Sequence, residues 1–186
     1  MTHRLPLHYR RTGKSAFLPG LLLAMTIACA SSPATTPDAR LNTRANFDPA
    51  GVPRLSSPVT DIHGVLGHDL EAELNHQLSK LRRERGFRVA VLVIPNTGKE
   101  TAERYAQRIY DANDLGGAGP NDGLLLLVAI DSKDIYTAIG EHLQPVFGPR
   151  AALEISRGIM IPYFQKKQYD RGVYAGTRAI IARLRG

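Results

Sequence analysis

The strongest constraint on the fold is an uninterrupted apolar run near the middle of the chain. Seven apolar residues follow Gly123 and reach from Leu124 to Ile130. A run of this kind, without alternating polar positions, is typical of a central strand that is buried on both faces. The rest of the chain must therefore supply a covering layer on each side of this strand.

Helical periodicity and a second apolar stretch precede this run. Leucines recur at helical spacing over residues 66–81, and basic residues follow them, as the helix dipole favours at a C-terminus. Gly86 is suited to end this helix, because glycine adopts the left-handed conformation easily. Residues 87–94 are largely apolar and end at Pro95, which indicates another buried strand.

Three further helices are predicted. Thr97 and Glu100 have the spacing of a capping box, and an amphipathic pattern follows them. Near the end of the chain, one helix is expected over about 149–161 and another after Asp170.

The apolar run forms one arm of a predicted hairpin. Residues 131–134 form a turn, and a short strand follows over 135–139. This connection is too short for a helical crossover, so the two strands should be antiparallel. Helices on both faces of a small mixed sheet, with the hairpin at about 123–139, predict an α/β fold of three layers, an α/β/α sandwich.

The N-terminal segment has the form of an export signal. Basic residues precede an apolar stretch over 16–28, which is too short to span a membrane. Cys29, the only cysteine, follows this stretch directly, as the lipid-acceptor residue of a bacterial lipoprotein does. The alternative is plain secretion with cleavage before Ser31. Because Ala30 rather than aspartate follows the cysteine, we expect outer-membrane sorting in a Gram-negative host, with the protein facing the periplasm.

Composition divides the chain into three parts. Residues 1–30 are the predicted leader, and residues 31–58 are rich in Ser, Pro, Thr and Ala. A segment of that composition buries too little apolar surface to fold, so we expect a flexible tether between the membrane and the domain. Residues 59–186 are then one domain.

The formal charge of +7 does not indicate nucleic-acid binding. The leader alone carries four basic and no acidic side chains, and residues 59–186 carry 17 basic and 15 acidic ones. A nearly neutral domain lacks the electrostatic footprint that nucleic acid requires. The expected partners are the membrane, through the lipid anchor, and other envelope proteins.

Polar residues gather where the hairpin strands begin and end. If residues 131 and 134 pair, Asp122 lies beside His142 at one edge of the sheet, next to Asn121 and Glu141. If strand 87–94 runs parallel to strand 135–139, two more binding-crevice residues join them, Asn96 and Thr97. Such a set could hold Ca²⁺ or another divalent cation, or act as acid and base. The same residues also fit a loop-shaping role, because Asp-Gly is a favourable turn dipeptide.

Several short motifs, in this order, resemble the TPM domain family over residues 59–186. They are Val59-Thr60-Asp61, Asn121-Asp122-Gly123 with the apolar run, Ile139-Gly140, Ile161-Pro162-Tyr163-Phe164 and Tyr169-Asp170-Arg171-Gly172. The resemblance implies an α/β/α sandwich on the periplasmic, lumenal or extracellular side of a membrane. It also implies acid phosphatase activity in some members, divalent-cation binding by acidic loop residues in some, and accessory roles for membrane complexes in others.

The resemblance places candidate metal ligands at Asp61 and Asp122, and the predicted hairpin geometry adds Glu141 as a third. The chain departs from the family pattern beside them. The usual Gly-Tyr-Gly-Leu-Glu is replaced by Gly140-Glu141-His142-Leu143-Gln144, Arg150 stands near a position that is acidic in the family, and Asn113 stands where Trp is common. We therefore expect a binding or accessory factor for envelope components, with at most weak cation binding. The alternative is a metal-assisted acid phosphatase.

Overall fold

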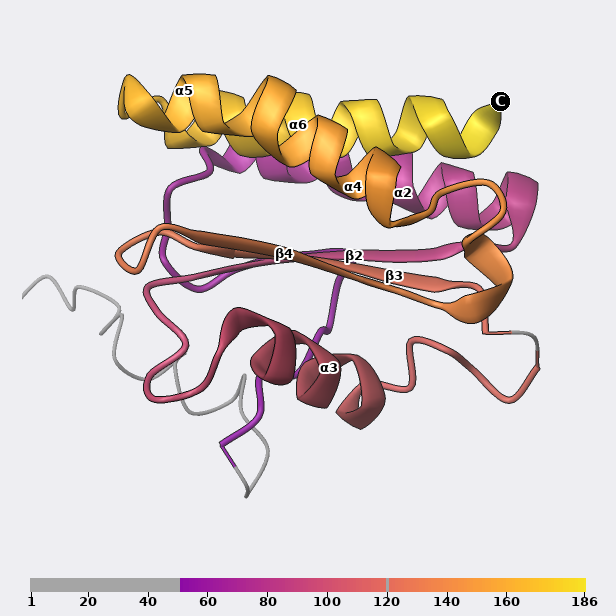
Figure 1. Ribbon diagram of the computed structural model, residues 1–186. Helices are drawn as coiled ribbons and strands as arrows, with labels where there is room; N and C mark the ends of the chain where they lie inside the picture. The colour runs from indigo at the N-terminus through magenta and orange to yellow at the C-terminus, as the bar shows by residue number, and fades with distance from the viewer. Residues whose placement is uncertain (1–50, 120) are drawn as a thin grey trace, which may run out of the picture. The chain divides into compact units, whose positions relative to one another are not determined.

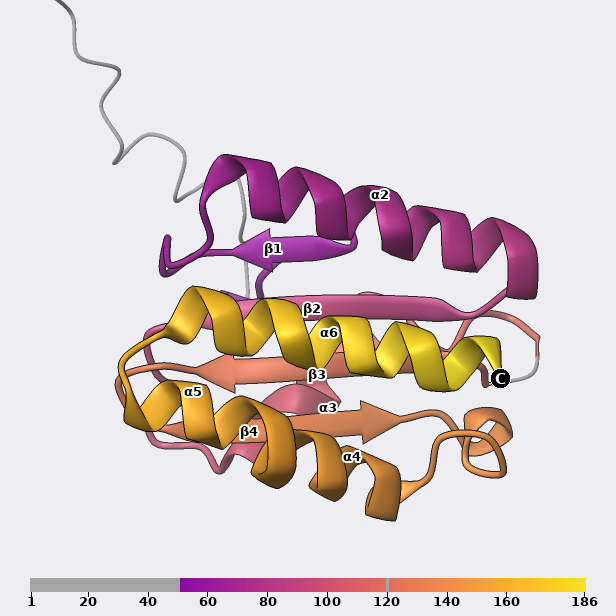
Figure 2. The same ribbon diagram turned by 90° about the horizontal axis from the view of Figure 1, so that it is seen from above.

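A four-stranded mixed sheet forms the centre of the domain. The computed structural model describes residues 51–119 and 121–186. The strands are β1 (Val59–Asp61), β2 (Arg88–Ile94), β3 (Gly123–Ala129) and β4 (Asp134–Ile139), and they lie in this order across the sheet (Figure 2). The first three are parallel to one another, and β4 is antiparallel to β3. The predictions on Cys29, the leader and residues 31–50 of the tether lie outside the described residues.

Helices cover both faces of this sheet (Figure 1). One face carries α2 (His68–Arg85), α4 (Pro149–Ile155), α5 (Ile161–Gln165) and α6 (Tyr169–Arg185), and the other carries α3 (Ala102–Ala112). Alternate residues of the central strands divide between two cores. Val91 and Leu126 lie in the core beneath α2 and α6, whereas Leu92 and Leu125 lie in the core beneath α3. The predicted three-layer α/β/α sandwich is confirmed.

Helix α2 begins and ends close to where the sequence predicts. Leu74, Leu78 and Leu81 are buried against the sheet. Gly86 ends the helix at φ +81°, and its backbone N–H donates to the carbonyl of Arg82.

Within the described residues, none of the helices combines the length and the apolar character needed to cross a bilayer.

The hairpin is confirmed, but its predicted register is wrong by two residues. Ala129 pairs with Asp134, so the connection holds four residues instead of two, and Lys133 in it has φ +60°. Gly140 therefore lies opposite Gly123, to whose carbonyl it donates a hydrogen bond of 2.8 Å. Because the shift is even, every side chain keeps its predicted face of the sheet.

The parallel direction assumed for strands 87–94 and 135–139 is also wrong. β2 runs parallel to β3, from Arg88 opposite Gly123 to Ile94 opposite Ala129, and is therefore antiparallel to β4. Asn96 and Thr97 consequently lie at the opposite edge of the sheet from Asp122.

The prediction of a capping box that begins at Thr97 is wrong as well. Thr101 is the N-cap of α3, and its hydroxyl oxygen accepts a hydrogen bond of 3.3 Å from the backbone N–H of Arg104. The hydroxyl of Thr97 donates instead to the carbonyl of Glu100, across a turn that contains Gly98 at φ +66°. The helix thus begins one turn later than predicted.

The predicted helix over 149–161 is present but irregular. Residues Ser156–Met160 form a π-helical segment between α4 and α5. Pro162 follows it, and proline has no N–H with which to donate to the carbonyl of Gly158. We attribute the wider turn to this missing hydrogen bond.

The ordered domain begins before residue 59. Val52 is buried, and the side chain of Asn113 fastens the segment behind it to the end of α3. The Asn113 Oδ1 atom accepts from the backbone N–H of Leu55 at 2.9 Å, and its Nδ2 donates to the carbonyls of Pro53 at 3.0 Å and Ile109 at 2.9 Å. Residues 52–58, assigned to the tether from composition, are therefore part of the folded unit.

We expect Asn113→Ala to loosen this segment. The substitution leaves partly buried backbone groups without partners, which should lower the free energy of unfolding by about 1–3 kcal/mol. Hydrogen exchange at the Leu55 amide should accelerate more than exchange in β2. Asn96→Ala is the control, since the one hydrogen bond of the Asn96 side chain to a described residue comes from Gly98 in an exposed turn. Equal effects of the two variants would contradict the role of Asn113.

Candidate functional site

The parallel strands divide the predicted site residues between two edges of the sheet, one at each end of the strands. The carboxyl ends of β1, β2 and β3 share one edge, where Asp61, Asn96 and Thr97 lie. Asn121 and Asp122 precede β3 and therefore lie at the other edge, together with the residues that follow β4. Asp61 is level with Val128 through the strand register, six residues beyond Asp122, which separates Asp61 from Asp122 by roughly 20 Å along the sheet.

The edge with Asp122 is held together mainly by backbone hydrogen bonds. The N–H of His142 donates to the carbonyl of Asn121 at 3.0 Å, and the N–H of Arg88 donates to the carbonyl of Asp122 at 3.2 Å. The predicted convergence of Asn121, Asp122, Glu141 and His142 is thus present. Glu141 and His142 are exposed, and neither has a side-chain hydrogen bond or ion pair within the described residues.

Asn121 has a structural role at this edge. Its side-chain oxygen accepts a hydrogen bond from the Tyr110 hydroxyl on α3. It also lies so close to Gly116 and Gly140 that a Cβ atom on either would be 2.8 Å and 2.5 Å from it, respectively. Both glycines are therefore needed for the close approach of the loop and the end of β4.

Burial of Tyr110 has a consequence at alkaline pH. Burial raises the pKa of this phenol, and the negative charges of Asp122 and Asp111 raise it further. The folded state therefore holds the phenolic proton more tightly than the unfolded state does. The stability that Tyr110 contributes is fully present below pH ~10, its ordinary pKa, and is lost as the pH rises through the higher pKa of the folded protein.

We expect Tyr110→Phe to lower the free energy of unfolding by about 1 kcal/mol at pH 7, because the hydrogen bond to Asn121 is lost. Above pH 10 the difference between the variant and the wild type should shrink. Denaturant unfolding at pH 7, 9 and 10.5 measures both. A difference that stays constant with pH would contradict a raised pKa of Tyr110.

At the other end of the strands, the carboxylate of Asp61 accepts hydrogen bonds from the turn that leads into α2. Its Oδ1 accepts from the backbone N–H of Gly64 at 2.7 Å, and its Oδ2 accepts from that of Leu66 at 2.6 Å. Nearby, burial raises the pKa of the Glu71 carboxyl, and the charge of Asp61 raises it further. His63 Nε2 lies 3.3 Å from Asp131 Oδ1 and links this turn to the hairpin loop.

The remaining predicted crevice residues also shape turns. Asn96 accepts from the N–H of Gly98 at 3.0 Å, and Thr97 is buried with its hydroxyl bonded to Glu100. Arg150, expected to oppose a cation, is exposed on the first turn of α4 and pairs with Glu154 at 3.0 Å. Within residues 51–119 and 121–186, no group of three or more His, Asp or Glu side chains is arranged to hold a metal ion.

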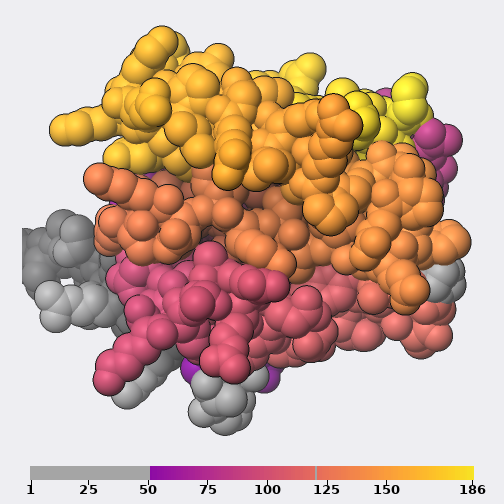
Figure 3. All heavy atoms as spheres, viewed as in Figure 1, coloured from indigo at the N-terminus to yellow at the C-terminus, as the bar shows by residue number. Residues whose placement is uncertain are grey.

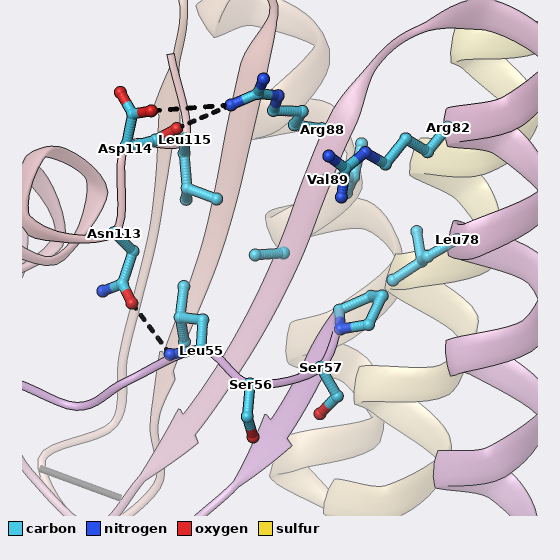
Figure 4. A pocket seen from close by; sticks show the side chains of 12 residues that line it. Leu55, Ser56, Ser57, Leu78, Arg82, Arg88, Val89, Asn113, Asp114 and Leu115 are labelled. Atoms are coloured by element: carbon cyan, nitrogen blue, oxygen red, sulfur yellow. Dashed lines mark hydrogen bonds and ion pairs between the residues drawn. The ribbon is translucent and has the colours of Figure 1, made fainter. Parts of the chain in front are cut away.

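Sequence reasoning missed a cleft beside the free part of β2. Its volume is about 250 Å³, and it lies between α2 and the segment that follows α3. Figure 4 shows Arg82 and Arg88 on one side of this cleft and Ser56 and Ser57 on the other. These residues lie far apart in the sequence and form no recognisable motif, so only the three-dimensional structure brings them together.

The architecture and the arrangement of motifs define a class of α/β/α domains with known relatives. The family model for the TPM domain matches residues 59–183, and the chain belongs to this family. A comparison with curated proteins gave no match.

Solved structures share the fold. The N-terminal domain of a protein from P. gingivalis is 25% identical, with a TM-score of 0.68 over 74% of this chain and 91% of that one. The BA42 protein from the psychrophilic bacterium Bizionia argentinensis is 14% identical, with a TM-score of 0.54 over 67% of this chain and 84% of that one. The N-terminal domain of the cg2496 protein from Corynebacterium glutamicum is 12% identical, with a TM-score of 0.53 over 68% and 79%. The last two similarities show the fold alone.

Proposed function

We propose that the protein is a lipid-anchored component of the cell envelope whose TPM domain acts by binding other envelope components. The observation that carries this proposal is the placement of Asp61. Both of its carboxylate oxygens accept backbone N–H groups, and it lies roughly 20 Å along the sheet from Asp122. The two acidic residues that match the family pattern therefore lie in separate loops, which argues against one catalytic centre that contains both.

Any cation site in this proposal is weak. Asp122 and Glu141 lie at the same edge, but a hard cation prefers six or more oxygen ligands. Two carboxylates beside exposed backbone would leave most of the coordination to water. Binding of Ca²⁺ would then be readily reversible and would not depend on Asp61.

The anchor rests on Cys29 at the end of the apolar leader. Each buried methylene contributes about 0.8 kcal/mol, so more than one acyl chain on this cysteine would hold the protein firmly in a membrane. The tether would then let the domain reach partners at a distance from the bilayer.

Mass spectrometry of the mature N-terminus, with fractionation of the producing cells, tests the proposal. We expect an acylated Cys29 and recovery in the membrane fraction, and recovery of Cys29→Ser in the soluble fraction or as an unprocessed precursor. An unmodified mature chain that begins at Ser31 would contradict the anchor.

A further inference from the structure

The cleft beside β2 exists because β1 stops short. The carbonyl of Pro58 accepts a hydrogen bond of 2.7 Å from the N–H of Val91, which is the last rung of the β1–β2 ladder at this end. The next rung would need an N–H at position 58 to donate to the carbonyl of Val89. Proline has none, so the ladder ends there.

Val89 therefore presents a free backbone edge to the cleft. In a parallel ladder the N–H and C=O of one residue face the same neighbouring strand, and this neighbour alternates along the chain. The N–H of Arg88 faces β3, since it donates to Asp122, and the N–H of Val91 faces β1. The N–H and C=O of Val89 thus face the side of β1, where no described residue pairs with them.

The walls of the cleft carry positive charge. Arg82 extends from α2 toward Val89 and forms no ion pair with the described residues (Figure 4). Arg88 is held in place, since its guanidinium donates to the carbonyl of Asp114 at 3.0 Å and lies 3.9 Å from the carboxylate of the same residue. The Arg88 side chain is itself 36% exposed, so its guanidinium remains accessible to a second anion.

The opposite side of the sheet, which is formed by β4, differs in charge from the β2 cleft. Figure 3 shows that face, with β4 lying between the helical layers of α4 and α3. A groove of about 320 Å³ runs along β4, and none of its lining residues is an arginine, lysine, aspartate or glutamate. Of these two hollows, both lined by described residues, the β2 cleft is the one that combines a free strand edge with arginines.

We propose that the β2 cleft binds an extended, carboxylate-bearing segment of a partner protein by adding it to the sheet beside Val89. Main-chain hydrogen bonds to Val89 supply the pairing, and Arg82 and Arg88 hold the carboxylate. The inference rests on the proposed binding function and specifies the chemistry of its partner. The carboxylate belongs either to an acidic side chain or to a chain terminus, since both present the same two oxygens.

Three synthetic peptides test this proposal against the purified full-length protein. The probes are acetyl-Val-Glu-Val-Glu-Val-amide, its Gln analogue acetyl-Val-Gln-Val-Gln-Val-amide, and the Gln peptide with a free C-terminal carboxylate. We expect chemical shift changes at the Val89 and Ala90 amides with one or both carboxylate peptides, and binding at least tenfold weaker with the Gln amide. The two carboxylate peptides separate a side-chain acid from a terminal one.

Substitutions locate the contact. Arg82→Ala and Arg88→Gln should each weaken binding about tenfold, the ratio that corresponds to one charge-assisted pair. Arg83→Ala, on the same helix but outside the cleft, should leave the affinity unchanged. The proposal would be overturned if Arg83→Ala weakened binding as much as the cleft variants do, or if the Gln amide bound as tightly as the carboxylate peptides. It would also be overturned if the Val89 amide showed no chemical shift change, or were already protected from hydrogen exchange in the free protein. Acylation of Cys29 is measured separately, so the anchored function can stand if the cleft binds nothing.

Discussion

Gly140→Ala should strongly destabilise the protein. A Cβ at this position would lie 2.3 Å from the backbone oxygen of Asn121 and 2.5 Å from its side-chain oxygen. The same backbone oxygen accepts from the N–H of His142, so the clash would also disturb the hydrogen bond that closes this edge. Because backbone atoms cannot move aside as a flexible side chain can, we expect a loss of about 2–4 kcal/mol in the free energy of unfolding.

Gly158→Ala is the matched control for this effect. Gly158 lies in the π-helical segment, and an added Cβ would meet no atom within 4 Å. Alanine there should be neutral or stabilising by up to about 1 kcal/mol, because it reduces the flexibility of the unfolded chain. Urea unfolding of both variants at pH 7 measures the difference. Similar midpoints for the two variants would show that the packing of Asn121 against Gly140 contributes little.

Asp61→Ala should have the second large effect. The substitution removes both acceptors of the hydrogen bonds from Gly64 and Leu66 and leaves their N–H groups unpaired at the entry to α2. Hydrogen bonds to a charged group contribute about 1.5–3 kcal/mol each, and the two share one side chain, so we expect a loss of about 2–4 kcal/mol. Asp61→Asn, which keeps one acceptor oxygen, should lose less than Asp61→Ala does.

Asp131→Ala provides the comparison at the same edge of the sheet. Asp131 contacts His63 at 3.3 Å, but its side chain is 62% exposed, and an exposed pair of this kind contributes little to stability. We expect a change below about 1 kcal/mol from this substitution. A loss from Asp61→Ala no larger than that from Asp131→Ala, measured by denaturant unfolding, would contradict the structural role of Asp61.

Long periodic segments made most of the fold predictable. The apolar run from Leu124 to Ile130 and the leucine spacing over 66–81 are strong signals, because a central strand and a covering helix each need many apolar residues. β1 has three residues and no such signal, so its presence follows only from pairing with β2. The hairpin register depends on a four-residue turn in which Lys133 has a left-handed conformation. Lysine rarely adopts this conformation, so a lysine in the sequence does not indicate such a turn.

The candidate site was less predictable, because it depends on strand direction. Asn121 and Glu141 were placed together correctly, since neighbouring strands of a hairpin must meet at both ends. Asn96 was placed with them on the assumption of a strand direction that proved to be reversed. The β2 cleft had no sequence signal, because it results from a hydrogen bond that Pro58 cannot form.

The proposed binding function implies that Asp61, Asp122 and Glu141 do not form a hydrolytic centre. The most direct test is the rate of phosphomonoester hydrolysis by the purified protein with Mg²⁺, Ca²⁺ or Zn²⁺, compared with Asp122→Ala. We predict no turnover that approaches the order of 1 per second typical of enzymes, and no difference between the wild type and the variant. Turnover at about that rate or faster that Asp122→Ala abolishes would contradict the claim and establish the protein as a phosphatase.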